Sequence, residues 1–258
     1  MNPQQISEID RHIAELQREG CTLLRNVLTV AEVAGICHGV DRAMKQSLAA
    51  AAESSPEAVA VRSRSESIYA ARNLLDLWPA ATEIWRVQPL IDLLTCVLGP
   101  DFGLVRGLFF DKPPEQTWAL PWHKDLMIAI HPNSRPGPRY SPPRPRAGVM
   151  QCEPPLEVLE RMLTVRFHLD PMTPDNGPLE VLPGSHRTGK TLRIEENADF
   201  APCKILGDAG DLFVMRPLLA HASGTSTPGN SQHRRIVHLE FCGLKNLPDG
   251  VHWHWFFP

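Results

Sequence analysis

Residues 163–186, LTVRFHLDPMTPDNGPLEVLPGSH, carry the clearest strand pattern in the chain. Two short apolar runs, residues 163–169 and 179–182, flank the turn-forming sequence Asp175-Asn176-Gly177-Pro178. Short apolar runs bounded by Pro, Gly, Asn or Asp are typical of β-strands, and Asn-Gly between two of them is a strong hairpin signal. We therefore expect two strands here, joined by a hairpin.

Further strand patterns lie on both sides of this stretch. Residues 104–110, 212–215 and 236–241 are short apolar runs in a region rich in Pro, Gly and Asn. Frequent proline, 25 residues in all, suits a chain with many turns and short strands. The part of the chain after Pro100 is therefore expected to be mostly β.

The first hundred residues have a helical pattern instead. Ile9, Ile13, Leu16 and the pair Leu23-Leu24 recur at about one or two helical turns. Thr29 and Glu32 are spaced as a capping box for a helix that runs toward residues 49–52. Residues 53–65 are small and polar and predict a loop. Apolar residues between Trp85 and Leu98 predict another helix, ended by Gly99-Pro100.

Helices first and strands later indicate an α+β fold with a β-sandwich or barrel core. A length of 258 residues fits one large domain. We expect a single domain over residues 1–258. In it, residues 1–100 are mainly helical support, residues 101–242 form the β core and residues 243–258 form a C-terminal tail.

Composition describes an ordinary globular protein, with 43% hydrophobic residues, 21% charged residues and a net charge of −3. The chain has no excess of basic residues that would indicate a nucleic-acid partner. No apolar run approaches the roughly 20 residues that span a bilayer. The six cysteines form no CxxC pair, which favours reduced thiols and disfavours a cysteine-based zinc site. We expect a cytoplasmic protein with neither a nucleic-acid nor a membrane partner.

Three histidines are followed two positions later by an acid. About one such pair is expected by chance from 11 histidines and 29 acidic residues in 258. The pairs are His123 with Asp125, His168 with Asp170, and His238 with Glu240. Oxygenases commonly hold Fe(II) with two histidines and one carboxylate. On an extended segment residues i and i+2 point the same way, so both members of such a pair can bind the same ion.

The context favours the first pair. His221 follows about a hundred residues later, just after an expected strand, where it can return as a second histidine ligand. Arg234 lies 13 residues beyond it, and a guanidinium pairs well with a dicarboxylate. We interpret the other two pairs as a strand residue followed by a turn-forming acid.

Several ordered motifs make the chain similar to the phytanoyl-CoA dioxygenase family. They lie within about residues 100–242. They are Pro121-Trp122-His123-Lys124-Asp125, Arg166–Asp170, Asn176-Gly177-Pro178-Leu179, Val181–His186, His221-Ala222-Ser223 and Arg234-Arg235. The resemblance implies a double-stranded β-helix, a jelly-roll and cupin-like core, with the N-terminal helices packed outside. It also implies an Fe(II)- and 2-oxoglutarate-dependent dioxygenase.

The resemblance implies roles residue by residue. Fe(II) is held by His123, Asp125 and His221, and 2-oxoglutarate by Arg234 with support from Ser223. Two additional residues between His221 and the arginines leave Arg235 as the alternative. The reaction consumes O2 and 2-oxoglutarate, releases succinate and CO2, and hydroxylates an unactivated C–H bond of a small molecule. Halogenating relatives lack the carboxylate that Asp125 supplies, so its presence favours hydroxylation, desaturation or ring formation.

Other features leave alternatives open. Arg166 either faces the core, where it meets 2-oxoglutarate or substrate, or faces outward to a surface acid. The role of Lys124 is undetermined, and His186 is interpreted as structural. Residues 132–147 hold four arginines in an expected long loop, either a lid for an anionic substrate or a solvated insertion. Competing functions are a cupin-like metal-binding lyase or isomerase without oxygenase activity, and a barrel used only for binding.

Overall fold

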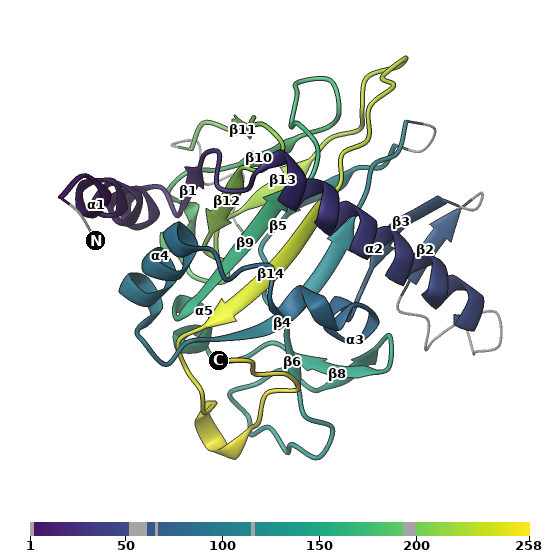
Figure 1. The fold of residues 1–258 in the computed structure, drawn as a ribbon. Coiled ribbons are helices and arrows are strands. Elements are labelled where there is room, and N and C mark those ends of the chain that lie inside the picture. Colours follow the sequence, from purple (N-terminus) through teal and green to yellow (C-terminus); the bar gives the residue numbers. More distant parts are fainter. Residues whose placement is uncertain (1–2, 52–60, 65–66, 115–116, 193–199) are drawn as a thin grey trace.

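The computed structural model describes residues 3–51, 61–64, 67–114, 117–192 and 200–258, whose strands form three antiparallel sheets (Figure 1). The large sheet has the order β1 (Cys21–Leu24), β12 (Leu212–Met215), β9 (Met162–His168), β14 (Ile236–Cys242), β4 (Gly103–Phe110), β3 (Ser67–Ala71) and β2 (Val61–Arg64). The second sheet has the order β11 (Cys203–Ile205), β10 (Leu179–Val181), β13 (His221–Ser223) and β5 (Leu120–His123). The third has the order β6 (Ile128–Ile130), β8 (Val149–Cys152) and β7 (Arg144–Arg146).

Helices cover the outer face of the large sheet, with α2 lying across it in Figure 1. The helices are α1 (Pro3–Arg18), α2 (Val30–Ala51), α3 (Leu74–Leu77), η2 (Pro79–Thr82), α4 (Gln88–Leu98), α5 (Leu156–Glu160), η3 (Ser185–Thr188) and η4 (Pro248–Gly250). The expected capping box is present, because Thr29 N donates to Glu32 Oε2 over 2.7 Å and Glu32 N donates to Thr29 Oγ1 over 3.3 Å. Gly99 follows α4 with a left-handed φ of 93°, as the sequence predicts.

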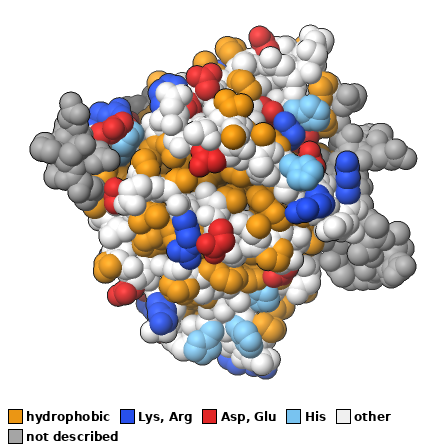
Figure 2. Space-filling view, in the orientation of Figure 1, with side chains coloured by type: hydrophobic (Ala, Val, Ile, Leu, Met, Phe, Trp, Pro, Cys, Tyr) orange, Lys and Arg blue, Asp and Glu red, His pale blue; other side chains and the backbone are white. Residues whose placement is uncertain are grey.

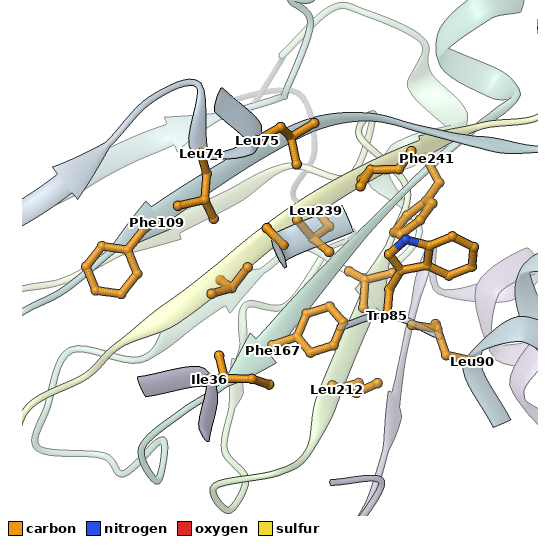
Figure 3. Close-up of a cluster of buried hydrophobic side chains, with 14 of the residues drawn as sticks. Ile36, Leu74, Leu75, Trp85, Leu90, Phe109, Phe167, Leu212, Leu239 and Phe241 are labelled. Carbon is orange, nitrogen blue, oxygen red and sulfur yellow. The ribbon is translucent and has the colours of Figure 1, made fainter. Parts of the chain in front are cut away.

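Alternation along the central strands separates the two faces of the large sheet. On β9, Val165 and Phe167 enter the hydrophobic core beneath the helices, together with Leu239 of β14 (Figure 3). The intervening residues, such as Arg166 on β9 and His238 on β14, point to the opposite face and are buried there. Because successive side chains of a strand point to opposite faces, one sheet carries both the core and a buried polar surface.

The two main sheets also pack against each other. Leu179 and Val181 of β10 form a buried cluster with Phe213 and Met215 of β12. The polar surface of the large sheet therefore lies on the side that meets the second sheet.

Three sequence expectations are wrong in detail. The strands expected at residues 163–169 and 179–182 exist, but they lie in different sheets, so no hairpin joins them. The first hundred residues are not purely helical, because they contribute three strands to the large sheet. Leu23 and Leu24 pair with Phe213 and Leu212 in β1 instead of extending α1. Pairing with a strand nearly 190 residues away overrides the local helical spacing.

Two expected loops also contain regular structure. The loop expected at residues 53–65 lies mostly outside the described residues, and its part at residues 61–64 is strand β2. The segment 132–147 ends in β7, which pairs with β8 through a turn at Ala147 and Gly148. Both turn residues have a positive φ, 50° and 78°, as a tight hairpin turn requires.

The C-terminal tail packs along the sheets. Phe257 bridges to Leu104, and Trp253 bridges to Ile130. The indole of Trp253 donates to Leu244 O over 2.8 Å. The interpretation of the aromatic tail as packing is consistent with these contacts.

The surface view in Figure 2 shows acidic and basic side chains interspersed on one face of the molecule. Among the described helices, none combines the length and apolar character that a bilayer span requires.

Candidate metal centre and cosubstrate pocket

His123, Asp125 and His221 meet at the junction of β5 and β13. His123 ends β5 and lies directly opposite His221 in the antiparallel ladder. The ring centroids of the two histidines are 4.2 Å apart. Asp125 Oδ1 lies 3.9 Å from His123 Nε2, and Asp125 Oδ2 lies 3.6 Å from His221 Nε2. One ligand atom from each residue lies within 4.8 Å of the others, so a single ion fits among them.

Backbone carbonyls orient both imidazoles toward this point. His123 Nδ1 lies 2.8 Å from Pro121 O, and His221 Nδ1 lies 2.9 Å from Leu219 O. A carbonyl only accepts, so each Nδ1 carries the proton and each Nε2 has a free lone pair. Metal-binding histidines typically make this second hydrogen bond, which fixes tautomer and ring orientation.

The charge states of Asp125 and His221 at neutral pH suit a cation. Burial alone would raise the pKa of Asp125, but His221 and other nearby basic side chains outweigh it and lower that pKa to about 2. Burial lowers the pKa of His221 to about 4. Asp125 Oδ2 is buried without a hydrogen-bond partner among the described residues. A buried anionic oxygen without a partner is costly, and a divalent cation here would satisfy it.

Arg234 is buried just before β14 and is 1% exposed. Its Nε and Nη1 have no hydrogen-bond partner among the described residues. Burial, reinforced by the nearby charge of Arg166, lowers its pKa to about 9, which still leaves the guanidinium charged at neutral pH. An unpaired buried guanidinium is a ready site for a carboxylate.

Arg235 is in a different position. It makes a bidentate pair with Asp170, with Nε to Oδ2 and Nη2 to Oδ1 both at 2.9 Å. The pair engages both Asp170, the acid of the second histidine–acid motif, and Arg235, the alternative arginine for 2-oxoglutarate. The geometry therefore favours Arg234 as the arginine that meets a cosubstrate.

The sequence analysis missed Lys112, which is fully buried beside these groups. Its Nζ donates to Ser223 Oγ over 3.1 Å and to Gly177 O over 3.2 Å, and it also contacts Gly224 O. Burial, with the charges of Arg234 and Arg166, lowers its pKa to about 6. Lys112 thus holds Ser223 in place and lies in an electropositive pocket. In the sequence, the one feature that could have indicated this residue is its position just after the apolar run at residues 104–110.

The Arg166 side chain faces inward and is buried, as in the first of the two orientations that the sequence left open. Its Nη1 lies 3.4 Å from His238 Nδ1, and His238 Nε2 lies 3.3 Å from Glu240 Oε1. Arg106 Nη1 donates to the same Glu240 oxygen over 3.2 Å. The third histidine–acid pair is therefore part of a buried strand network. The interpretation of Glu240 as a turn-forming acid is wrong, because β14 continues through it.

A cavity of about 380 Å³ opens onto His123 and Asp125 of the triad. Its lining includes the predicted ligands His123 and Asp125 and the network residues Arg106, His238 and Glu240. Apolar side chains complete the wall, among them Leu108, Phe110, Trp118, Leu120, Leu126 and Met127. An apolar cavity with a few converging polar groups is the usual form of a small-molecule site.

Lys124 does not join the triad. Its Nζ donates to Ser185 O over 2.9 Å, to Thr188 Oγ1 over 2.9 Å and to Gly189 O over 2.6 Å. It anchors the segment that contains η3. His186 in the same segment packs against Gly20 and stays apart from the triad, as expected for a structural residue.

The arginines of segment 132–147 divide by position. Arg146 lines the cavity. Arg139 instead pairs on the surface with Glu157 and Asp249, at 2.7 and 3.1 Å. The segment therefore contributes to the cavity through its β7 end.

Comparison with known proteins agrees with this site. The model of the phytanoyl-CoA dioxygenase family matches residues 16–236. L-proline trans-4-hydroxylase from Streptomyces griseoviridis is 22% identical over 225 residues, which cover 76% of this chain and 75% of that enzyme.

Solved structures share the fold at low sequence identity. EctD from S. alaskensis, in a complex with 2-oxoglutarate and 5-hydroxyectoine, has a TM-score of 0.65 and 20% identity over 96% of this chain and 84% of that chain. AviO1 from Streptomyces viridochromogenes Tue57 has a TM-score of 0.64 and 19% identity over 93% of this chain and 97% of that chain. EvdMO1 has a TM-score of 0.63 and 21% identity, and this chain spans about half its length, with 91% and 50% covered.

The family match and the triad define a non-haem iron dioxygenase that depends on 2-oxoglutarate. The chain belongs to the phytanoyl-CoA dioxygenase family.

Proposed function

We propose that this chain hydroxylates an unactivated C–H bond of a small molecule, with His123, Asp125 and His221 as the Fe(II) ligands. The observation that carries the assignment is the convergence of two free Nε2 atoms and a buried, unpartnered Asp125 oxygen at one point. Two histidines and one carboxylate are the donor set of non-haem Fe(II) oxygenases.

Arg234 is proposed to bind the distal carboxylate of 2-oxoglutarate. Its Nε and Nη1 lack partners among the described residues, and a guanidinium pairs with a carboxylate through Nη2 together with either of these atoms. Lys112, whose pKa is lowered by burial and by the charge of Arg234, holds the Ser223 hydroxyl. Arg166 adds a further buried positive charge close to Arg234. Burial outweighs the nearby carboxylates, Asp111 for Arg234 and Asp125 for Arg166, and a dianionic cosubstrate would compensate the buried positive charge.

When bound, iron and 2-oxoglutarate supply the oxidation with O2, which releases succinate and CO2. The protein's residues hold and orient the reactants. The carbonyls of Pro121 and Leu219 fix the imidazoles, and the apolar wall of the cavity excludes water from the reacting C–H bond.

We propose that the two facing sheets form a double-stranded β-helix, a jelly-roll core within one domain. The antiparallel pairing and the helices outside the large sheet support this description. A cytoplasmic location stays a prediction.

The test is succinate formation from 2-oxoglutarate by purified protein with Fe(II) and O2, measured with and without a chelator. We expect metal-dependent succinate from the wild type and none from His221→Ala. Metal binding without any succinate would favour the lyase or isomerase alternative instead.

A further inference from the structure

The buried polar groups between the two main sheets lie in layers, and strand pairing fixes which groups share a layer. Lys112 and Arg234 exchange both of their backbone hydrogen bonds at 3.2 Å, so they lie opposite each other just beyond β4 and just before β14. Lys112 Nζ also reaches Ser223 Oγ on β13 over 3.1 Å. These three residues form the first layer, where Arg234 is the proposed partner of the distal carboxylate of 2-oxoglutarate.

The histidine ligands of the metal form the second layer. His221 precedes Ser223 by two positions on β13, which corresponds to about 7 Å along a strand. His221 lies opposite His123 in the ladder between β13 and β5. The step from the first layer to the metal centre is therefore short enough for one five-carbon dicarboxylate to contact both.

Arg166 reaches the second layer from the opposing sheet. It pairs in register with His238, four positions beyond Arg234 on the same segment, and its Nη1 lies 3.4 Å from His238 Nδ1. Burial lowers the pKa of Arg166 to about 10, against the opposite effect of the Asp125 carboxylate. Burial also lowers the pKa of His221, and the charge of Arg166 contributes to that shift. The guanidinium is therefore near two of the metal ligands and is charged at neutral pH.

Arg166 has no salt bridge in the part of the chain that the structure describes, where its hydrogen-bond contact is with His238 Nδ1. Because an arginine only donates, His238 Nδ1 accepts, and His238 Nε2 carries the proton 3.3 Å from Glu240 Oε1. Arg106 also donates to this oxygen over 3.2 Å, so Glu240 is already engaged. Arg166 is 7% exposed, and a buried charge without an anion at contact distance is costly unless a bound molecule supplies one.

We infer that Arg166 binds the second carboxylate of 2-oxoglutarate, the one beside the keto group, while Arg234 binds the distal carboxylate. The inference rests on the proposed dioxygenase function. The two arginines lie in successive layers, and each keeps N–H donors for an anion. Arg166 thereby positions the carboxylate that leaves as CO2, next to the metal ligands, and the cosubstrate is held at both ends.

The experiment titrates 2-oxoglutarate anaerobically into the intact chain loaded with Fe(II). It records the Kd and, at saturation, the position of the visible absorption band of the Fe(II) and 2-oxoglutarate complex. In this band an electron moves from the iron to the keto acid, so a positive charge beside the keto acid lowers the transition energy. The band therefore reports on the end of the cosubstrate at the metal and not on the distal end.

Arg166→Gln should raise the Kd about tenfold or more, as expected for a lost charged hydrogen bond, and should move the band to shorter wavelength. Arg234→Gln should raise the Kd as well but leave the band at its wild-type position once the site is saturated. Arg166→Lys keeps a positive charge, so it should recover part of the affinity and part of the band position.

Arg106→Gln is the matched control. Burial raises the pKa of Asp125, and Arg106 is one of the basic groups that together outweigh this effect, so it is also a cation close to the triad. Unlike Arg166, it pairs with Glu240. We expect Arg106→Gln to change the Kd by less than about threefold and to leave the band in place. A band shift as large as that of Arg166→Gln would overturn the inference, because any nearby cation would then have the same effect.

The outcomes separate the inference from the function on which it rests. If the wild type binds Fe(II) and 2-oxoglutarate but Arg166→Gln has an unchanged band and a Kd within about threefold, the inference is overturned and the dioxygenase function stands. Loss of Fe(II) binding in Arg166→Gln would also overturn it, since the residue would then support the metal site. If Arg166→Gln does not fold, Arg166→Lys decides, because a normal Kd and band would confirm the role of the charge and loss of both with intact Fe(II) binding would overturn it. A wild type that binds neither Fe(II) nor 2-oxoglutarate would overturn the proposed function and the inference together.

Discussion

Replacing Arg234 by glutamine removes a guanidinium that is buried without a partner for its Nε and Nη1. Glutamine is polar but shorter and uncharged, so the pocket loses the positive charge and the several N–H donors of the guanidinium. We expect the affinity for 2-oxoglutarate to fall while Fe(II) binding is retained, because Arg234 does not belong to the metal triad.

The magnitude follows from the number of donors. Hydrogen bonds to charged groups contribute about 1.5–3 kcal/mol each, and Arg234 offers two unpaired donors. Glutamine can replace part of one of them. A net loss of about 3 kcal/mol corresponds to a rise of about 100-fold in the Kd of 2-oxoglutarate.

The adjacent Arg235→Gln variant is the matched control. It breaks the bidentate pair with Asp170, whose two contacts are both 2.9 Å. We expect it to lower the free energy of unfolding and to change the Kd of 2-oxoglutarate by less than threefold. In contrast, Arg234→Gln removes a buried positive charge close to Arg166, so the protein without cosubstrate should be at least as stable as the wild type.

The assay combines anaerobic calorimetry of 2-oxoglutarate binding to the Fe(II) protein with thermal unfolding of the protein without cosubstrate. The two variants should show opposite patterns in affinity and stability. The reasoning is refuted if Arg235→Gln loses more affinity than Arg234→Gln, or if Arg234→Gln binds 2-oxoglutarate within threefold of the wild type.

Three further predictions concern stability and pH. Burial lowers the pKa of His168 to about 3, so between about pH 6.5 and pH 3 the unfolded chain binds a proton that the folded chain does not, and stability is lost as pH falls through this range. In the metal-free protein, His168→Gln should reduce the slope of the unfolding free energy against pH by the equivalent of about one proton, and an unchanged slope would contradict the low pKa of His168. Lys124→Met should lower the free energy of unfolding by about 2 kcal/mol, because the carbonyls of buried Ser185 and half-buried Gly189 lose this donor. Urea titration tests this, and a 2-oxoglutarate Kd that rises as far as in Arg234→Gln would argue against a purely structural role. Thr29→Ala should cost about 1 kcal/mol by removing the cap of α2, and no shift in the urea midpoint would show that the cap contributes little.

The strands and the triad were predictable from local patterns. Short apolar runs located β4, β9, β12 and β14 to within a residue or two, because both faces of these strands are buried or nearly so. His123 and Asp125 are two positions apart on an extended segment, and the place of His221 just after an expected strand, together with the family resemblance, indicated the distal ligand. The comparison of Arg234 with Arg235 needed the structure, since adjacent residues on one chain differ only in the direction they face.

What the sequence could not reveal depends on long-range pairing. The turn at Asn176 is real, because its side chain contacts Pro171 O and Thr173 N over 2.7 and 3.0 Å. The turn alone does not decide whether the flanking strands pair or enter different sheets. Similarly, Leu23 and Leu24 fit a helix by spacing, and only their pairing with β12 makes them a strand. Glu240 was misinterpreted as a turn residue and Lys112 was missed, because a charged residue in a strand pattern does not by itself show what it faces.

The most direct test is a crystal structure of the protein with Fe(II) and 2-oxoglutarate, in which anomalous scattering at the iron edge locates the ion. We predict one ion bound by the Nε2 atoms of residues 123 and 221 and by a carboxylate oxygen of residue 125. An ion held instead by the imidazole and carboxylate of residues 238 and 240, or elsewhere in the molecule, would contradict the account.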